Sequence, residues 1–224
     1  DTYNTGLVEV PLGTTFRKII YDIGGGMKIK KRKLKAVQLG GPSGGCIPES
    51  FLDMPVTYED IAKAGTIMGS GLMVVMDERS CMVSLAKFSF ENSAEESCGK
   101  CTPCRVGTRI MLDLLTDITE GRGREEDIEL LEDLSHQIIG TSLCGLGKLA
   151  PNPVLSTIKH FRNEYEAHIK DKWCFTGVCR DLATFYIDEK LCKGCGMCLR
   201  ACPTKAIFGE KKKPHKIMQD LCIR

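Results

Sequence analysis

One group of closely spaced cysteines carries the clearest chemical signal in this sequence. Cys192, Cys195, Cys198 and Cys202 are separated by two, two and three residues, and Pro203 follows the last of them. Three thiolates from one short turn can each bind a different corner of a cuboidal iron–sulfur cluster, and this spacing is typical of [4Fe–4S] sites. It fits a structural zinc site poorly. The spacing therefore predicts cluster binding in this segment.

A second group has the same design with a more distant fourth member. Cys98, Cys101 and Cys104 share one short loop, and Cys144 follows in a turn between two stretches of helical periodicity. A helix that begins near Cys104 would direct its N-terminal N–H groups toward a negatively charged cluster. These residues predict a second [4Fe–4S] site.

Three further cysteines and a histidine suit a different metal. A Cys3His set can hold structural zinc in a tetrahedron, and such an ion would fasten the first part of the chain to the last. His160, on the same expected helix, is the rival histidine, and free buried thiols are the alternative. Cys81 lies in an apolar stretch and is interpreted as a small core residue. The predicted ligands are Cys46, His168, Cys174 and Cys179.

The totals restrict the class of protein. The chain has 224 residues, a net charge of +2 and 13 cysteines. An odd cysteine count in tight groups favours metal-bound thiolates in a reducing, cytoplasmic compartment over disulfides. We expect no transmembrane segment, no nucleic-acid partner, because no aromatic residues interleave with the basic runs, and no hydrolytic site. The start at Asp1 suggests a fragment.

Periodicity places these cysteines on an α+β, multidomain chain. We expect a small α+β domain over residues 1–85, a helical domain over 86–170 that holds the first cluster, a connection over 171–183, and a compact cysteine-rich domain over 184–224. The first domain has strand patterns at 7–10, 34–37 and 72–76 and a short helix at 16–23, and three apolar stripes of helical spacing occupy 106–118, 128–138 and 154–165.

The motif residues also carry a family resemblance. Ser97–Gly107 together with Leu143–Gly147 resembles the flavoprotein subunit of respiratory complex I and the NADH-linked subunits of bacterial NAD(P)-reducing and electron-bifurcating hydrogenases and formate dehydrogenases. Residues 5–85 resemble the soluble-ligand-binding β-grasp domain of that family. The tail is similar to a truncated bacterial-type ferredoxin domain, which points to the hydrogenase branch.

The resemblance implies an oxidoreductase function. In the family, hydride passes from NADH to FMN, and single electrons pass to the cluster held by the residues that match Cys98, Cys101, Cys104 and Cys144. The implied partners are a thioredoxin-like [2Fe–2S] subunit, a hydrogenase or similar catalytic subunit, and a ferredoxin. The loop Gly40–Gly45 is not a dinucleotide-binding motif, so we expect FMN and NAD(P)H to bind only to the full-length subunit. This chain alone then has no catalytic residues and no hydride-transfer activity.

The tail departs from the two-cluster pattern. In such ferredoxins the cysteine before proline binds the other cluster, so Cys202 would pair with a motif that starts at Cys222, where the chain nearly ends. We expect up to two clusters in the intact tail and incomplete ones here. Two rival hypotheses remain: a zinc-stapled scaffold or subunit-interaction module without a redox role, and a β-grasp domain that binds a cobalamin or quinone-like ligand. Brown colour and a paramagnetic signal after reduction would separate iron–sulfur protein from a zinc scaffold.

Overall fold

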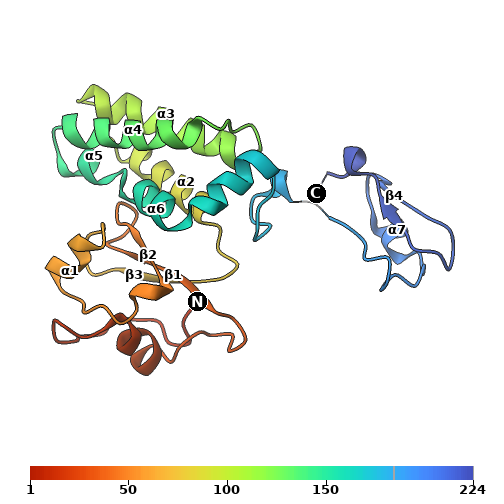
Figure 1. Cartoon of the computed structure of the whole chain (residues 1–224), viewed down its shortest axis with the longest axis horizontal. Coiled ribbons are helices and arrows are strands. Elements are labelled where there is room, and N and C mark those ends of the chain that lie inside the picture. The colour runs from red at the N-terminus through yellow and green to blue at the C-terminus, as the bar shows by residue number, and fades with distance from the viewer. Residues whose placement is uncertain (184, 224) are drawn as a thin grey trace.

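The computed structural model describes residues 1–183 and 185–223. Along the chain, a unit with a small sheet is followed by a helical unit and then by a small tail, which stands apart from the other two (Figure 1). The sequence prediction of a mixed helix and sheet protein is confirmed. Within the described residues, no helix has both the length and the apolar character needed to cross a bilayer.

The sheet unit is built around the strand β1 (Leu34–Leu39). The strands β2 (Cys46–Pro48) and β3 (Met73–Asp77) pair with it on either side, both antiparallel. The short helix α1 (Tyr58–Lys63) lies between β2 and β3 in the chain, and Thr57 caps it by accepting a hydrogen bond from the N–H of Asp60. The core of this unit includes Phe16, Ile20, Val37, Ile47 and Leu52.

Two of the three strand patterns become strands of the sheet, and one does not. Residues 7–10 form no strand, and Leu7 and Val8 are exposed, because no neighbouring strand pairs with this segment. The pattern at 72–76 is a continuous apolar run, which is typical of a strand buried on both faces, but the structure differs, since Val74 is 39% exposed. The segment at 16–23 does form a helical turn, whose π-helical part η1 covers Lys18–Ile23.

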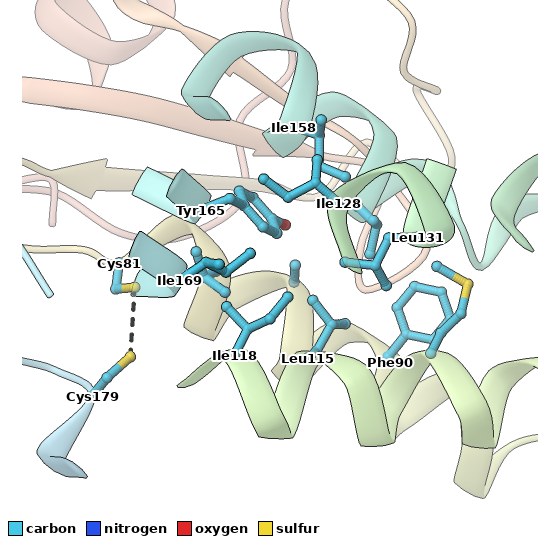
Figure 2. Close-up of a cluster of buried hydrophobic side chains, with 14 of the residues drawn as sticks. Cys81, Phe90, Leu115, Ile118, Ile128, Leu131, Ile158, Tyr165, Ile169 and Cys179 are labelled. Carbon is cyan, nitrogen blue, oxygen red and sulfur yellow. Dashed lines mark hydrogen bonds between the residues drawn. The ribbon is translucent and has the colours of Figure 1, made fainter. Parts of the chain in front are cut away.

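The helical unit has four long helices around one core. Gly107, in the helix Thr102–Thr119, faces Ile138, in the helix Asp127–Thr141, so closely that a Cβ at position 107 would lie 2.7 Å from the Ile138 side chain. The core includes Phe90, Leu115 and Tyr165 (Figure 2). The helices are α2 (Met82–Glu95), α3 (Thr102–Thr119), α4 (Asp127–Thr141), the short α5 (Gly145–Leu149) and α6 (Asn152–Glu166).

The three apolar stripes correspond to α3, α4 and α6, whereas no pattern in the sequence indicated α2. Several short turns complete the two units and the connection: the 3-10 turns η2 (Glu49–Phe51) and η4 (Arg180–Leu182), and the π-helical extension η3 (Ala167–Asp171) at the end of α6. The extension carries His168.

Buried polar contacts join the sheet unit to the helical unit. The side chain of Glu164 on α6 forms an ion pair of 2.6 Å with Lys35 on β1, and its second oxygen accepts a hydrogen bond from the N–H of Met82 at the start of α2. The N–H of Cys46 on β2 donates to the hydroxyl of Ser156 on α6 at 2.9 Å. The sheet and α6 are therefore held at a fixed distance.

The tail is a small fold of its own. It contains α7 (Met197–Ala201), the two paired strands β4 (Ile207–Phe208) and β5 (Lys216–Ile217), and the turn η5 (Gln219–Leu221). The side chain of Gln219 donates a hydrogen bond to the carbonyl of Phe185 at 2.8 Å, which brings the end of the tail back to its beginning.

Candidate cluster-binding and metal sites

The loop that contains Cys98, Cys101 and Cys104 leads directly into a long helix. Cys101 is the N-cap residue of α3, Pro103 occupies its first turn, and Cys104 is buried there while Cys98 is exposed. The hydroxyl of Ser97 lies 3.3 Å from the Cys104 sulfur. Three thiols thus gather at the N-terminus of an 18-residue helix, where the backbone dipoles favour negative charge.

The fourth cysteine is brought to this loop by α5. Cys144 is the N-cap residue of α5. The backbone N–H of Leu143, just before it, hydrogen-bonds to the Cys101 sulfur, and together with the N–H of Cys104 it holds the pKa of the Cys101 thiol below its ordinary value. The loop before α3 and the loop before α5 therefore meet, as the sequence prediction of a shared site requires.

The close approach of the two loops depends on a missing side chain. A Cβ at Gly147 on α5 would lie 2.4 Å from the hydroxyl of Ser142 and 3.2 Å from the Cβ of Cys104, so a larger residue would push α5 away from α3. Ser142 is buried, and its hydroxyl has no hydrogen-bond partner within the described part of the chain. Sulfur acceptors of a cluster would suit such a donor.

The donor set fits an iron–sulfur cluster better than a single ion. Among the described residues, one group alone brings three or more His, Cys, Asp or Glu donor atoms within 4.8 Å of one another, and Cys98, Cys101, Cys104 and Cys144 are not in it. Thiolates around a cuboidal cluster stand farther apart than thiolates around one ion, because each binds a different iron. A spacing wider than that of a single-ion site is what a cluster needs.

The cysteine loop of the tail is shaped by glycine. Gly194 and Gly196 both have positive φ, at +63° and +74°, and a Cβ at Gly194 would lie 2.6 Å from the backbone of Lys213. These two positions allow the loop that carries Cys195 and Cys198 to fold tightly. Both cysteines are at least partly exposed.

Neighbouring groups stabilise two thiolates of the tail. The backbone N–H of the buried His215 lies 3.4 Å from the Cys192 sulfur and its imidazole 3.7 Å, and these contacts lower the pKa of Cys192. A hydrogen bond from the Thr204 hydroxyl lowers the pKa of Cys202. Cys222 follows η5 and is partly buried. Whether Cys202 and Cys222 share a second cluster stays a prediction.

A separate group of four side chains that could bind a metal lies at one end of the helical core. The donor atoms of the group lie within 4.8 Å of one another, and all four residues are buried. Figure 2 shows the sulfurs of Cys81 and Cys179 turned toward each other at the edge of the core, 3.7 Å apart. The Nε2 atom of His168 lies 3.4 Å from the first and 3.3 Å from the second. The members are Cys81, His168, Cys174 and Cys179.

The group corrects the predicted ligand set at one position. Cys46 lies elsewhere, in a cluster with Ala36, Met76 and Met82, where burial raises the pKa of its thiol to about 12. Cys81 takes its place, because it is the N-cap residue of α2 rather than part of a strand, so its sulfur faces the end of α6. The rival His160 packs edge-on against Phe51 and is not in the group.

The backbone aims the histidine of this group at its sulfurs. The Nδ1 atom of His168 lies 2.6 Å from the carbonyl of Glu164, one turn earlier, so Nδ1 donates and Nε2 is left for the sulfurs or a metal. Without a metal, burial disfavours the imidazolium, but hydrogen bonds to Cys174 and Cys81 outweigh it and raise the pKa of His168 to about 10. Contacts with Cys179, and then with Cys81 and His168, lower the pKa of Cys174 and favour its thiolate.

Comparison with known proteins agrees with this arrangement. Residues 84–168 match the profile of the NADH-ubiquinone oxidoreductase-F iron–sulfur binding region. The helical unit belongs to that family. Residues 185–208 match the profile of a 4Fe-4S binding domain. Both matched stretches are iron–sulfur binding regions, and they contain the cysteine groups that predicted clusters.

Individual relatives come from both branches of the resemblance. The NADP-reducing hydrogenase subunit HndC of Solidesulfovibrio fructosivorans is 52% identical over 212 residues, which cover 95% of this chain and 43% of the relative. The F subunit of the NADH-quinone oxidoreductase of Escherichia coli is 39% identical over 188 residues, with 84% and 42% covered. The chain spans less than half the length of these relatives.

A solved structure supports the fold. The crystal structure of an NAD+-reducing [NiFe]-hydrogenase in the H2-reduced state matches with a TM-score of 0.67 and 31% identity, over 76% of this chain and 28% of the other. The HndC alignment, in contrast to the alignment with the Escherichia coli relative, covers nearly all of this chain, which includes the tail.

Proposed function

We propose that this chain is the electron-transfer part of a subunit of an NADH-linked oxidoreductase, of the hydrogenase type. The observation that carries the proposal is that the loop before α3, which contains Cys98, Cys101 and Cys104, meets the loop before α5, which contains Cys144, within the matched iron–sulfur region. A bound [4Fe–4S] cluster would supply one-electron chemistry there. The relative HndC, whose alignment extends over the tail, favours the hydrogenase type over a complex I subunit.

Each part of the chain has a role in this proposal. Cys98, Cys101, Cys104 and Cys144 hold one cluster, and Cys104 and the packing of α5 keep water from one side of it. The tail holds a further cluster at Cys192, Cys195 and Cys198, with Cys202 and Cys222 serving the second one. The sheet unit serves as a β-grasp domain, followed by the helical cluster domain and by a ferredoxin-like domain in the tail.

The cofactors and partners of the whole subunit extend beyond this chain. FMN and NAD(P)H bind to another part of the full-length subunit, and the partners are a thioredoxin-like [2Fe–2S] subunit, a hydrogenase-like catalytic subunit and a ferredoxin, in the cytoplasm. What supports this is the naming of the relatives as subunits of NADP-reducing hydrogenase and NADH-quinone oxidoreductase.

We also propose that the second group binds one structural zinc ion through Cys81, His168, Cys174 and Cys179. A tetrahedron with Zn–S bonds of about 2.3 Å and a Zn–N bond of about 2.0 Å has edges of about 3.8 Å between sulfurs and about 3.5 Å between sulfur and nitrogen. The distances of 3.7 Å between two sulfurs and 3.3 and 3.4 Å to Nε2 are close to these edges. The distance of 3.7 Å between the two sulfurs is far too long for a disulfide.

The test of electron transfer is anaerobic reconstitution of the chain with iron and sulfide. We expect a brown protein whose dithionite-reduced form gives a paramagnetic signal, and Cys101→Ser should remove one component of that signal and about four irons per chain. Cys46→Ser serves as the control, because Cys46 lies in the sheet core, and it should leave iron content unchanged. A colourless, iron-free product from the unmodified chain would overturn the proposal.

The test of the zinc proposal is metal analysis of the chain purified without added metal. We expect about one zinc ion per chain, lost in Cys81→Ser and in Cys179→Ser and retained in Cys46→Ser. If zinc content fell with Cys46→Ser and not with Cys81→Ser, the assignment of ligands would be wrong.

A further inference from the structure

One buried hydroxyl at the candidate cluster site lacks a hydrogen-bond partner among the described residues. Among the described residues, two buried side-chain N or O atoms lack a hydrogen-bond partner, and the hydroxyl oxygen of Ser142 is one of them. Ser142 is 4% exposed. Leaving a buried donor unpaired costs about 1–3 kcal/mol, and buried polar groups in native proteins almost always have a partner. The unpaired hydroxyl needs an acceptor that the polypeptide does not provide.

The position of this hydroxyl indicates what the acceptor is. The point that a Cβ of Gly147 would occupy lies 2.4 Å from the Ser142 oxygen and 3.2 Å from the Cβ of Cys104. Ser142 ends α4, and Cys144 follows it two residues later. The hydroxyl therefore lies where the two cysteine loops meet, beside the buried cysteine of the set. The acceptors that a bound cluster adds at this place are its sulfides and the cysteine thiolates.

A second serine already shows this kind of contact from the other side. The Ser97 hydroxyl oxygen lies 3.3 Å from the Cys104 sulfur, and it accepts a hydrogen bond from the N–H of Gly99 at 3.4 Å. Because the oxygen of Ser97 is occupied as an acceptor, its proton is available to the sulfur. Each of the two loops therefore has one serine hydroxyl near Cys104, and only that of Ser97 contacts its sulfur.

We propose that Ser142 donates a hydrogen bond to the sulfur atoms of the [4Fe–4S] cluster at Cys98, Cys101, Cys104 and Cys144, and thereby raises the reduction potential of that cluster. Reduction adds one electron to the cluster and makes its sulfurs more negative, so a hydrogen bond to sulfur stabilises the reduced form more than the oxidised form. No bond to Ser142 forms or breaks, and its proton stays on its oxygen. The inference rests on the proposed function and adds a residue that tunes it.

The experiment compares Ser142→Ala with the unmodified chain and with Ser135→Ala. Ser135 lies on the same helix and is also buried, but its hydroxyl donates to the carbonyl of Leu131 at 2.6 Å, so the control deletes a hydroxyl that is satisfied inside the protein. The three reconstituted proteins are titrated with dithionite while the paramagnetic signal of the cluster is recorded. The signal is assigned by its loss in Cys101→Ser.

We expect Ser142→Ala to keep the iron content and the signal, and to make reduction about tenfold less favourable, which is a downward shift of about 59 mV for one electron. Ser135→Ala should leave the potential unchanged. The metal-free Ser142→Ala chain should be at least as stable as the unmodified one, because an unpaired donor has been removed.

An unchanged potential in a Ser142→Ala protein with full iron content would overturn this inference alone, and so would an equal shift in Ser135→Ala. Absence of the cluster from the unmodified chain would instead overturn the proposed function as well, and the two failures are therefore distinguishable.

Discussion

The ion pair between Glu164 and Lys35 permits a quantitative test of how the sheet and helical units are joined. In Glu164→Gln the amide oxygen can still accept the hydrogen bond from the N–H of Met82, so the change removes the negative charge and little else. The carboxylate side chain is 5% exposed and that of Lys35 is 16% exposed. The substitution therefore leaves a positive charge buried without its partner.

The magnitude follows from that burial. Removal of one partner of a buried ion pair costs about 3–5 kcal/mol. Lys35 keeps a hydrogen bond to the carbonyl of Ser80 and lies 6.0 Å from the ring centre of Phe161, and a cation near an aromatic ring recovers about 0.5–1 kcal/mol. We therefore expect the lower end of the range, a loss of about 3 kcal/mol in the free energy of unfolding.

The assay is urea unfolding of the metal-free chain, followed by the fluorescence of Trp173, the single tryptophan, and by circular dichroism. Asp53→Asn is the matched control, because the pair of Asp53 with Arg17 has the same length of 2.6 Å but is exposed at both ends. That control should cost less than about 1 kcal/mol. Equal losses in the two variants would refute the reasoning that burial makes the Glu164 pair structural.

Three further predictions concern packing and pH. Gly147→Ala should cost about 1–3 kcal/mol by overpacking against Ser142 and should weaken cluster retention, measured as unfolding and iron content; full iron content at unchanged stability would contradict it. Leu131→Ala, in the fully buried core, should cost about 2–5 kcal/mol in urea unfolding without loss of iron at native conditions, and a cost under about 1 kcal/mol would contradict it. Burial opposes the carboxylate of Asp77, but hydrogen bonds from a backbone N–H and from Arg32 hold its pKa below 3.8, so its contribution is present above about pH 4 and is lost as the pH falls through the folded-state pKa. The stability difference between the unmodified chain and Asp77→Asn should therefore shrink below about pH 4, and a difference that grew on acidification would contradict the sign.

Local sequence patterns predicted the elements whose cause is local. The apolar stripes of α3, α4 and α6 repeat at helical spacing, and the spacing of the cysteines in each loop is enough to predict a [4Fe–4S] site. The helix α2 was not predicted, because it follows β3 closely and because its small and polar buried residues, such as Ser89 and Ser93, weaken the apolar pattern. The strand predicted at residues 7–10 was wrong for the opposite reason, because an alternating pattern forms a strand only where another strand is available to pair with it.

The ligand set of the second metal site could be predicted in part for the same reason. Cys174, Cys179 and His168 are neighbours in the sequence, so grouping them required no knowledge of the fold. The fourth member depends on how the start of α2 packs on the end of α6, and that contact joins residues 87 positions apart. Spacing alone does not distinguish Cys46 from Cys81 as that member. Cys81 is the N-cap residue of α2, and because no pattern in the sequence indicated that helix, this position is known only from the fold.

The separation along the chain between the two facing thiols has a thermodynamic consequence. Cys81 and Cys179 are 98 positions apart, so an ion held between them closes a loop that includes nearly the whole helical unit. A covalent crosslink over about 100 residues removes about 4.7 kcal/mol of conformational freedom from the denatured chain in the loop-closure model. Zinc at this place would act as such a crosslink in a reducing compartment, where a disulfide would not persist, and a chelator rather than a reductant would open it.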